Sequence, residues 1–306
     1  MLVVTATSDR ARADELDTDA AAPAVVPAND PQRASSVVPS LAVPPPPPTT
    51  TFAVDPVADG AVILLAGGFA GLLDLINSTG EVRPQQIARD FDTSSLLGID
   101  RGAISQTPSS DARMLSNVGL FTAIGFAALD PALSGIREQS LQAALSDAVI
   151  YLQSIAVTWG VTNLAKIAVR RPRPQAYIDA AAHRDDPTYS SSETDSSLSF
   201  FSGHASMTAT IASTATYLAF ARSPNTARPW VTLALGTAIT TFVAVERVRG
   251  GSHFPTDVIA GAIAGAGVGI VVPHIHRSED AKQRRVWVGF APHPGGGGSA
   301  SLTGIF

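Results

Sequence analysis

The sequence predicts an all-α protein in which about six helices form a bundle that crosses a membrane, preceded by a disordered N-terminal segment. Two observations support this fold class. Hydrophobic residues make up 45% of the 306 residues and charged residues only 15%, whereas roughly 25% charged residues is usual in a soluble domain. From about residue 60 onward, apolar stretches alternate with short polar loops. We therefore expect this part of the chain to prefer an apolar setting.

The N-terminal segment, residues 1–58, is rich in Ala, Pro, Asp, Ser and Thr and contains a proline run over residues 44–48. It shows no helical or strand period, which is typical of a disordered or polyproline linker. A ligand for a proline-binding domain is the alternative. Residues 2–7 are apolar, and residues 11–13 resemble a small-x-small cleavage site, the pattern of a partial signal sequence.

The helical domain is expected over residues 59–277. The uncharged runs of its helices are at or below the roughly 20 residues of a spanning helix, so a soluble six-helix bundle remains an alternative. The first helix also contains Asp74, which leaves open whether it spans. The helices are expected near residues 61–76, 115–129, 142–168, 204–221, 229–247 and 256–273.

The sixth helix carries a repeated small residue. Gly261, Gly265 and Gly269 recur at four-residue intervals and so lie on one face of the helix. A face without side chains lets a neighbouring helix approach closely. We expect this face to pack inside the bundle.

Basic residues predict the orientation of the helices. By the positive-inside rule, the ends that carry them are cytoplasmic. Residues 169–203 and 247–255 then lie together on the opposite, external face. The basic residues follow the fourth helix (Arg222, Arg228) and the sixth (Arg277, Lys282, Arg284, Arg285).

The C-terminal tail, residues 278–306, begins basic and becomes Gly-rich. Residues 286–290 alternate weakly between apolar and other side chains, which indicates a strand or hairpin. We assign this tail no function.

Charge and composition exclude several classes of function. A formal net charge of -5 gives no global basic field, so nucleic-acid binding is not expected. The chain has no cysteine, which rules out disulfides, thiolate zinc sites and cysteine nucleophiles. Any anion site must therefore be local.

The first motif that could take part in a reaction lies at the end of the third expected helix. Four basic residues lie within eight positions, from Lys166 through Arg170 and Arg171 to Arg173. Such residues often anchor a helix at a membrane interface. Lys166 and Arg173 could instead grip a phosphate, because the planar Arg fork donates two parallel hydrogen bonds and Lys supplies a compact charge.

The second motif, Ser202-Gly203-His204, opens the fourth helix. The free backbone N–H groups and the dipole of a helix N-terminus attract an anion. A histidine at this position can give a proton to the bound group or take one from it. Capping or solvated histidines are the common alternative.

The third motif leads from Glu246 and Arg247 through two glycines to His253 and Asp257. His253 and Asp257 are four residues apart, so one helical face can hold the carboxylate near the imidazole. A carboxylate bonded to one ring nitrogen leaves the other free as a nucleophile or base. An isolated pair of this kind is usually structural.

Together the motifs carry far more weight than any one of them. Lys-x6-Arg-Pro is followed after 26 residues by Phe-Ser-Gly-His, and after 41 more by Glu-Arg-x5-His-x3-Asp. This arrangement resembles the signature of the type-2 phosphatidic acid phosphatase superfamily, which includes vanadium-dependent haloperoxidases, over residues of about 115–273. The family pattern usually has proline in place of Phe201 and serine in place of Glu246. Neither departure removes a proposed catalytic residue.

The resemblance implies a hydrolase whose three motifs converge at one end of a helical bundle. Its phosphate would be bound by Lys166, Arg173, Arg247, Ser202 and the backbone at Gly203. His253 would be the nucleophile that forms a phospho-histidine, oriented by Asp257. His204 would protonate the leaving alkoxide and then activate water. No metal and no cofactor are implied, because three fixed cations can balance the phosphate charge.

The expected substrate is a lipid phosphate, either a monoester or a pyrophosphate, in a bacterial inner membrane with the pocket facing the periplasm. Three alternatives remain open: a vanadium-dependent haloperoxidase, a soluble periplasmic acid phosphatase with the same pocket, and a non-catalytic phospholipid-binding membrane protein. The motifs do not name the phosphate ester.

Overall fold

The computed structural model describes residues 51–278, except residues 81, 89 and 192, and also the backbone of two strands near the C-terminus. Most of the predicted linker and all of the expected signal sequence lie outside the described residues. The chain divides into two compact units, one of which is Thr50–Ala281. This unit contains all the helices of the described residues.

The other unit consists of Met1–Thr49 and Lys282–Phe306. Its described part is a two-stranded antiparallel sheet of β1 (Val286–Pro292) and β2 (Gly298–Gly304), in which Val286 pairs with Gly304. The tail therefore contains the hairpin that the alternation over residues 286–290 indicated.

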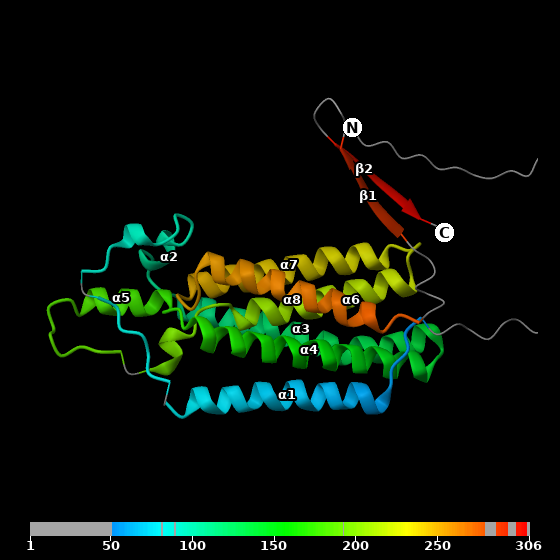
Figure 1. The fold of residues 1–306 in the computed structure, drawn as a ribbon, viewed down its shortest axis with the longest axis horizontal. Coiled ribbons are helices and arrows are strands. Elements are labelled where there is room, and N and C mark those ends of the chain that lie inside the picture. Colours follow the sequence, from blue (N-terminus) through cyan, green and yellow to red (C-terminus); the bar gives the residue numbers. More distant parts are fainter. Residues whose placement is uncertain are drawn as a thin grey trace, which may run out of the picture. The chain divides into compact units, whose positions relative to one another are not determined.

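Six long helices lie side by side in the described part of the first unit (Figure 1). All six helices predicted from the sequence are confirmed, and each extends beyond its predicted ends. They are α1 (Pro56–Ser78), α3 (Ser110–Glu138), α4 (Leu141–Val169), α6 (Gly203–Arg222), α7 (Arg228–Arg249) and α8 (Pro255–Ile275).

The short elements were not predicted, because they are too brief to show a period. They lie in the connections at the end of the bundle where α4 stops and α6 starts (Figure 1). They are η1 (Thr93–Ser95), α2 (Arg101–Ile104), α5 (Pro174–Ala182) and η2 (Thr194–Ser197).

The helical unit begins earlier than the predicted boundary at residue 59. Asp55 caps α1, its carboxylate accepting the N–H groups of Val57 and Ala58. Phe52 is only 1% exposed, and the N–H of Ala53 donates to the carbonyl oxygen of His276 at 2.8 Å. The start of α1 and the end of α8 therefore lie together at one end of the bundle.

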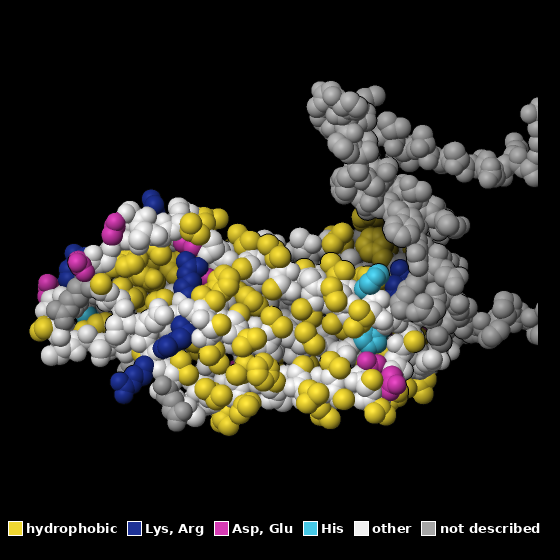
Figure 2. All heavy atoms as spheres, viewed as in Figure 1, with side chains coloured by type: hydrophobic (Ala, Val, Ile, Leu, Met, Phe, Trp, Pro, Cys, Tyr) yellow, Lys and Arg dark blue, Asp and Glu magenta, His cyan; other side chains and the backbone are white. Residues whose placement is uncertain are grey.

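Among the described residues, five helices are long and apolar enough to cross a membrane: α1, α3, α4, α7 and α8. Large hydrophobic side chains such as Leu64, Phe121, Trp230 and Ile263 are exposed on them. On the face seen in Figure 2, hydrophobic side chains run along the bundle and charged ones gather toward its ends. This distribution is that of a membrane protein.

The sixth long helix, α6, occupies the middle of the bundle, where it packs against α3, α4, α7 and α8. It is rich in Ala, Ser and Thr, and Thr208, Thr210 and Thr214 are fully buried. Thr210 Oγ1 donates to the carbonyl oxygen of Ser206 at 2.9 Å. Because neighbouring helices shield α6 from lipid, it needs no apolar surface of its own.

The three glycines of α8 pack against α6, as predicted. Cβ atoms built on Gly261, Gly265 and Gly269 would lie 2.7, 2.0 and 2.5 Å from carbonyl oxygens of α6 or its cap. Any side chain there would force the two helices apart. This contact fixes the start of α8 next to the start of α6.

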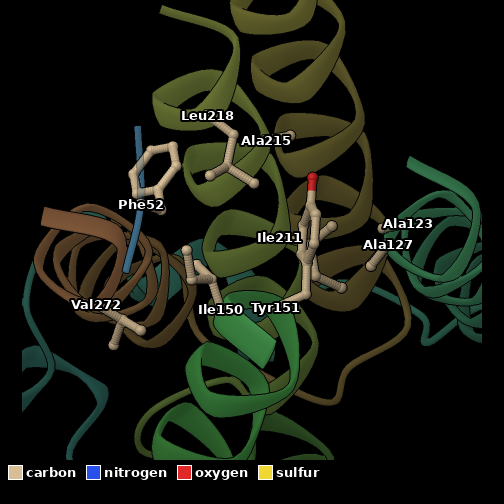
Figure 3. Packing of buried hydrophobic residues seen from close by; sticks show 9 residues of the cluster. All are labelled: Phe52, Ala123, Ala127, Ile150, Tyr151, Ile211, Ala215, Leu218 and Val272. Atoms are coloured by element: carbon tan, nitrogen blue, oxygen red, sulfur yellow. The ribbon is translucent and has the colours of Figure 1, made fainter. Parts of the chain in front are cut away.

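The apolar core lies toward the other end of the bundle, around Ile150, Ile211 and Leu218 (Figure 3). Tyr151 belongs to this core, and its hydroxyl donates to Asp130 Oδ2 at 3.1 Å. The core therefore joins α3, α4 and α6 at the end away from the motifs.

Asp74 does not prevent α1 from packing as a full-length helix. Its carboxylate accepts the indole N–H of Trp159 at 2.8 Å and the side-chain amide of Asn163 at 2.7 Å. Both partners lie on α4, so the acid fastens α1 to the bundle. The 23 residues of α1 make it a candidate span.

Candidate active site

The three motifs meet at one end of the bundle. The first closes α4, the second opens α6, and the third forms the loop from α7 to α8. The N–H of Ser202 donates to the carbonyl oxygen of Asp257 at 3.1 Å, which ties the start of α6 to α8. A Cβ atom built on Gly203 would lie 3.8 Å from Nζ of Lys166, so the ammonium group lies beside the first turn of α6.

The start of α6 offers unpaired backbone donors. Ser202 is the N-cap, and its hydroxyl oxygen accepts the N–H of Ala205 at 3.4 Å. Gly203 and His204 occupy the first turn, where N–H groups have no intrahelical partner. Phe201, at the position of the family's proline, is buried beside Gly261 and leaves this helix start intact.

Arg173 reaches the same place from the cap position of α5. Its backbone N–H donates to the carbonyl oxygen of Ser196 at 2.7 Å. Its Nη2 donates to Asp195 Oδ1 at 2.6 Å and its Nε to the carbonyl oxygen of Asp195 at 2.8 Å. Its Nη1 is 3.4 Å from the carbonyl oxygen of Ser252, the residue before His253. The guanidinium therefore faces the third motif while two of its nitrogens donate to Asp195.

Arg247, near the end of α7, is 8% exposed. Its Nη1 is 3.4 Å from the hydroxyl of Ser116, and its buried Nε has no partner among the described residues. Glu246, which departs from the family pattern, accepts Nη1 of Arg249 at 2.8 Å. This acid therefore pairs with a neighbouring arginine and leaves the Arg247 guanidinium available to an anion.

His253 is 1% exposed in the loop before α8. Its Nδ1 is 2.7 Å from the carbonyl oxygen of Ser199. Since a carbonyl only accepts, Nδ1 carries the hydrogen and Nε2 keeps its lone pair. Burial, followed by the charges of three cations of the motifs, holds the pKa of His253 well below its usual value. The imidazole is therefore neutral near pH 7, as a nucleophile requires.

The expected direct hydrogen bond from the imidazole of His253 to the carboxylate of Asp257 does not form in this structure. Asp257 Oδ2 is 4.0 Å from Nδ1 of His253. The carboxylate instead accepts the hydroxyl of Ser199 and, at 2.9 Å, the N–H of Phe254. Asp257 thus holds the two backbone segments that flank the imidazole, and the carbonyl of Ser199 orients the ring.

Two further residues support Asp257, and the sequence did not assign them a role. Arg171 donates to Asp257 Oδ1 at 2.6 Å and to Asp100 Oδ2 at 2.8 Å. Asp100 is fully buried and also accepts the N–H and hydroxyl of Thr256. Arg171 belongs to the run of basic residues from Lys166 to Arg173 that the sequence showed. Asp100 lies 71 residues away from it in a segment without any motif, so no pattern could have indicated it.

A cavity of about 510 Å³ opens on this end of the bundle. Arg173, Arg247 and Ser252 contribute to its wall, so it reaches two of the three motif cations. Its other side chains are mainly polar, and they include Asp179, Tyr189, Glu193 and Asp195 from the α5 and η2 region. A phosphate ester could enter through this cavity.

The first turns of α3 also line the site, although sequence reasoning missed them. Arg113 Nε donates to the carbonyl oxygen of Gly250 at 2.7 Å, and Ser116 is the partner of Arg247. Asn117 Oδ1 lies 2.8 Å from Nε2 of His204. None of these residues belongs to a spaced motif, which is why no sequence signal indicated them.

Two comparisons with known proteins gave a match. Residues 147–280, from within α4 to beyond α8, match the model of the PAP2 superfamily. Among solved structures, the chain is similar to a transmembrane PAP2 type phosphatidylglycerolphosphate phosphatase from Bacillus subtilis. The two share 18% identity over 74% of this chain and 98% of that chain, with a TM-score of 0.45. No curated protein was found to match.

Proposed function

Since residues 147–280 belong to the PAP2 superfamily, we propose that the protein is a metal-independent membrane phosphatase that hydrolyses lipid phosphates through a phospho-histidine at His253. The single observation that carries the proposal is the state of His253. Its imidazole is buried, and Nδ1 lies 2.7 Å from the carbonyl oxygen of Ser199, which leaves the lone pair on Nε2. The charges of Lys166, Arg173 and Arg247 act on it.

The cations of the three motifs bind the phosphate. Arg173 and Arg247 present planar forks toward the cavity, and Lys166 adds a point charge beside the start of α6. The N–H groups at Gly203 and the cap at Ser202 complete the phosphate-binding site. These fixed donors stabilise the charge that builds up on the phosphoryl oxygens in the transition state.

The reaction then proceeds in two steps. Before the ester binds, burial and then the charges of Arg247, Lys166 and Arg173 lower the pKa of His204 to about 3, so His204 takes its proton from the ester monoanion on binding. Nε2 of His253 then attacks phosphorus, the ester P–O bond breaks, and the protonated His204 gives its proton to the leaving alkoxide. Neutral His204 next takes a proton from water as the water oxygen attacks phosphorus and the P–N bond breaks. Phosphate leaves with the proton from His204, and both histidines return to their starting states. A placed histidine contributes roughly 10² to 10⁴ in rate through such proton transfer.

Asp257 acts on the nucleophile through its neighbours. By accepting the hydroxyl of Ser199 and the N–H of Phe254, it fixes the carbonyl that orients His253. Its charge, 4.0 Å from Nδ1, also favours the imidazole carrying positive charge after phosphorylation. We therefore keep Asp257 in the site, as a positioning residue.

Phosphate release from purified protein tests the proposal. The panel contains phosphatidate, phosphatidylglycerophosphate, an isoprenoid pyrophosphate and a small water-soluble ester. Hydrolysis of at least one lipid phosphate, abolished by His253→Ala, is expected. If vanadate instead confers halide-dependent peroxidase activity and no ester is cleaved, the haloperoxidase alternative is correct. Binding of lipid phosphate without turnover would make the protein a non-catalytic phospholipid-binding protein.

We also propose that the pocket faces the periplasm of a bacterial inner membrane. Arg222 pairs with Asp147 at 2.5 Å, and Arg228 lies 3.6 Å from Asp130, so these two arginines stabilise the bundle interior. The orientation therefore depends more on the basic residues that follow α8. Those beyond residue 278 lie outside the described part of the chain.

A further inference from the structure

A hydrogen bond between Asn117 and His204 links α3, which lies outside the matched segment, to the proposed proton donor, His204. Asn117 Oδ1 is 2.8 Å from Nε2 of His204, across 87 residues of sequence. Within the described part of the chain, this is the only hydrogen bond of the His204 ring. Asn117 also lines the cavity that reaches Arg173 and Arg247. The amide therefore lies on the wall of the cavity through which we propose that the ester enters.

The turn of α3 that carries Asn117 is fixed in place, because the start of α3 is bound to the third motif. The N–H of Ser109, the cap of α3, donates to the carbonyl oxygen of Arg249 at 3.0 Å. Arg113 donates to the carbonyl oxygen of Gly250 at 2.7 Å. Shortly after Asn117, Gly119 meets α7 closely, since a Cβ there would lie 2.6 Å from a methyl group of Val243.

We infer that Asn117 is a positioning residue that keeps hydrogen on Nε2 of His204, so that the catalytic proton is exchanged at Nδ1. An amide oxygen only accepts, so the ring nitrogen facing it must donate. With Nε2–H fixed in this way, the ring can change its protonation only at Nδ1. The inference rests on the proposed function, in which His204 is the acid and then the base.

The proton balance is complete in both steps. During phosphorylation, the P–O bond breaks while the Nδ1 proton of the His204 imidazolium moves to the leaving oxygen. The ring is then neutral, with Nε2–H still bonded to Asn117. During hydrolysis, water gives a proton to Nδ1, its oxygen bonds to phosphorus, and the P–N bond to His253 breaks. No other proton carrier is required.

The test uses three variants of the full-length protein in detergent. Asn117→Leu keeps the branched shape of the side chain but removes the acceptor, whereas Asn117→Asp keeps the acceptor. Ser190→Val changes another residue of the same cavity wall. Each is assayed with p-nitrophenyl phosphate, whose leaving group needs no acid, and with an alkyl phosphate that the wild type accepts.

We expect Asn117→Leu to lower kcat/KM about 10-fold or more for the alkyl ester and to leave the value for p-nitrophenyl phosphate within about threefold, since only the alkoxide needs a proton. Asn117→Asp should restore the wild-type ratio of the two substrates. Ser190→Val should not change that ratio. This ratio is independent of the fraction of protein that folds.

Two results overturn the inference while leaving the proposed function intact. One is an equal loss for both substrates in Asn117→Leu, which would mean a general structural role. The other is an unchanged kcat/KM for the alkyl ester. A wild-type protein that hydrolyses neither substrate and forms no phospho-enzyme would instead contradict the proposed function itself.

Discussion

Nδ1 of His253 donates to the carbonyl oxygen of Ser199 at 2.7 Å. This contact decides which nitrogen of the buried histidine can attack phosphorus, and it comes from the loop before α6 and not from a side chain of α8. The motif spacing had placed a carboxylate in that role. The orientation of the nucleophile therefore depends on the packing of two backbone segments that are distant in sequence.

Substituting the two histidines should have effects of different kinds. His253→Ala should abolish both turnover and the phospho-enzyme, because it removes the attacking nitrogen. His204→Ala should slow hydrolysis of the phospho-enzyme, so an acid-labile phospho-histidine should accumulate with a good leaving group. Rapid-quench labelling with a ³²P-labelled aryl phosphate measures both. Labelled enzyme in His253→Ala would falsify the assignment of the nucleophile.

Asp257→Asn should reduce both rate and stability while leaving anion binding largely intact. The buried carboxylate accepts from Arg171, Ser199 and Phe254. In asparagine an NH₂ group replaces one carboxylate oxygen, so a donor would face another donor. Breaking a buried pair of this kind costs about 3–5 kcal/mol.

Thermal unfolding in detergent, kcat and the inhibition constant of vanadate check this prediction. Ser199→Ala is the matched control, since it removes a single bond to the same carboxylate and should cause a smaller loss. If vanadate binding is lost as completely as turnover, Asp257 contributes to the phosphate-binding site and is more than a positioning residue.

Asp195 should compete with phosphate for Arg173. Its carboxylate is 2.6 Å from Nη2, its side chain is 70% exposed, and it lines the cavity. Asp195→Asn should tighten vanadate inhibition by about two- to fivefold, corresponding to an exposed ion pair of ~0.5–1 kcal/mol. Glu193→Gln changes a neighbouring acid of the same cavity wall and serves as the control. Weaker vanadate binding in Asp195→Asn would mean that this acid positions Arg173 for the phosphate.

Activity should survive chelators. The phosphate charge is met by Lys166, Arg173, Arg247 and the start of α6, so no metal ion is needed in the transition state. Among the described residues, no three His, Cys, Asp or Glu side chains are grouped to hold a metal. Phosphate release is measured before and after dialysis against EDTA. Loss of activity that magnesium restores would contradict the metal-free mechanism.

Cysteine labelling tests the orientation in the membrane. The chain has no native cysteine, so Ser190→Cys and Asn225→Cys each introduce one thiol, at exposed positions on opposite ends of the bundle. In intact spheroplasts, an impermeant thiol reagent should modify only the first. Labelling of only the second would invert the topology, and labelling of both would indicate a soluble exported protein.

The fold was largely predictable because helix signals are local. Each long helix was visible as an apolar stretch, and the glycines at positions 261, 265 and 269 indicated a close packing face. The choice of α6 as the central helix was not predictable. Its Ser and Thr residues fit a membrane bundle only because α3, α4, α7 and α8 surround this helix and shield it from lipid.

The sequence by itself determined the residues whose chemical type and spacing define the three motifs, from Lys166 to Asp257, and the number of long helices that carry them. Only the tertiary structure decided how these groups are oriented. The partners of His253, His204 and Asp257 include Ser199, Asn117 and Arg171, which lie 54, 87 and 86 residues away in sequence. Hydrogen bonds over such separations depend on how the helices pack, and no local pattern of side chains encodes that packing.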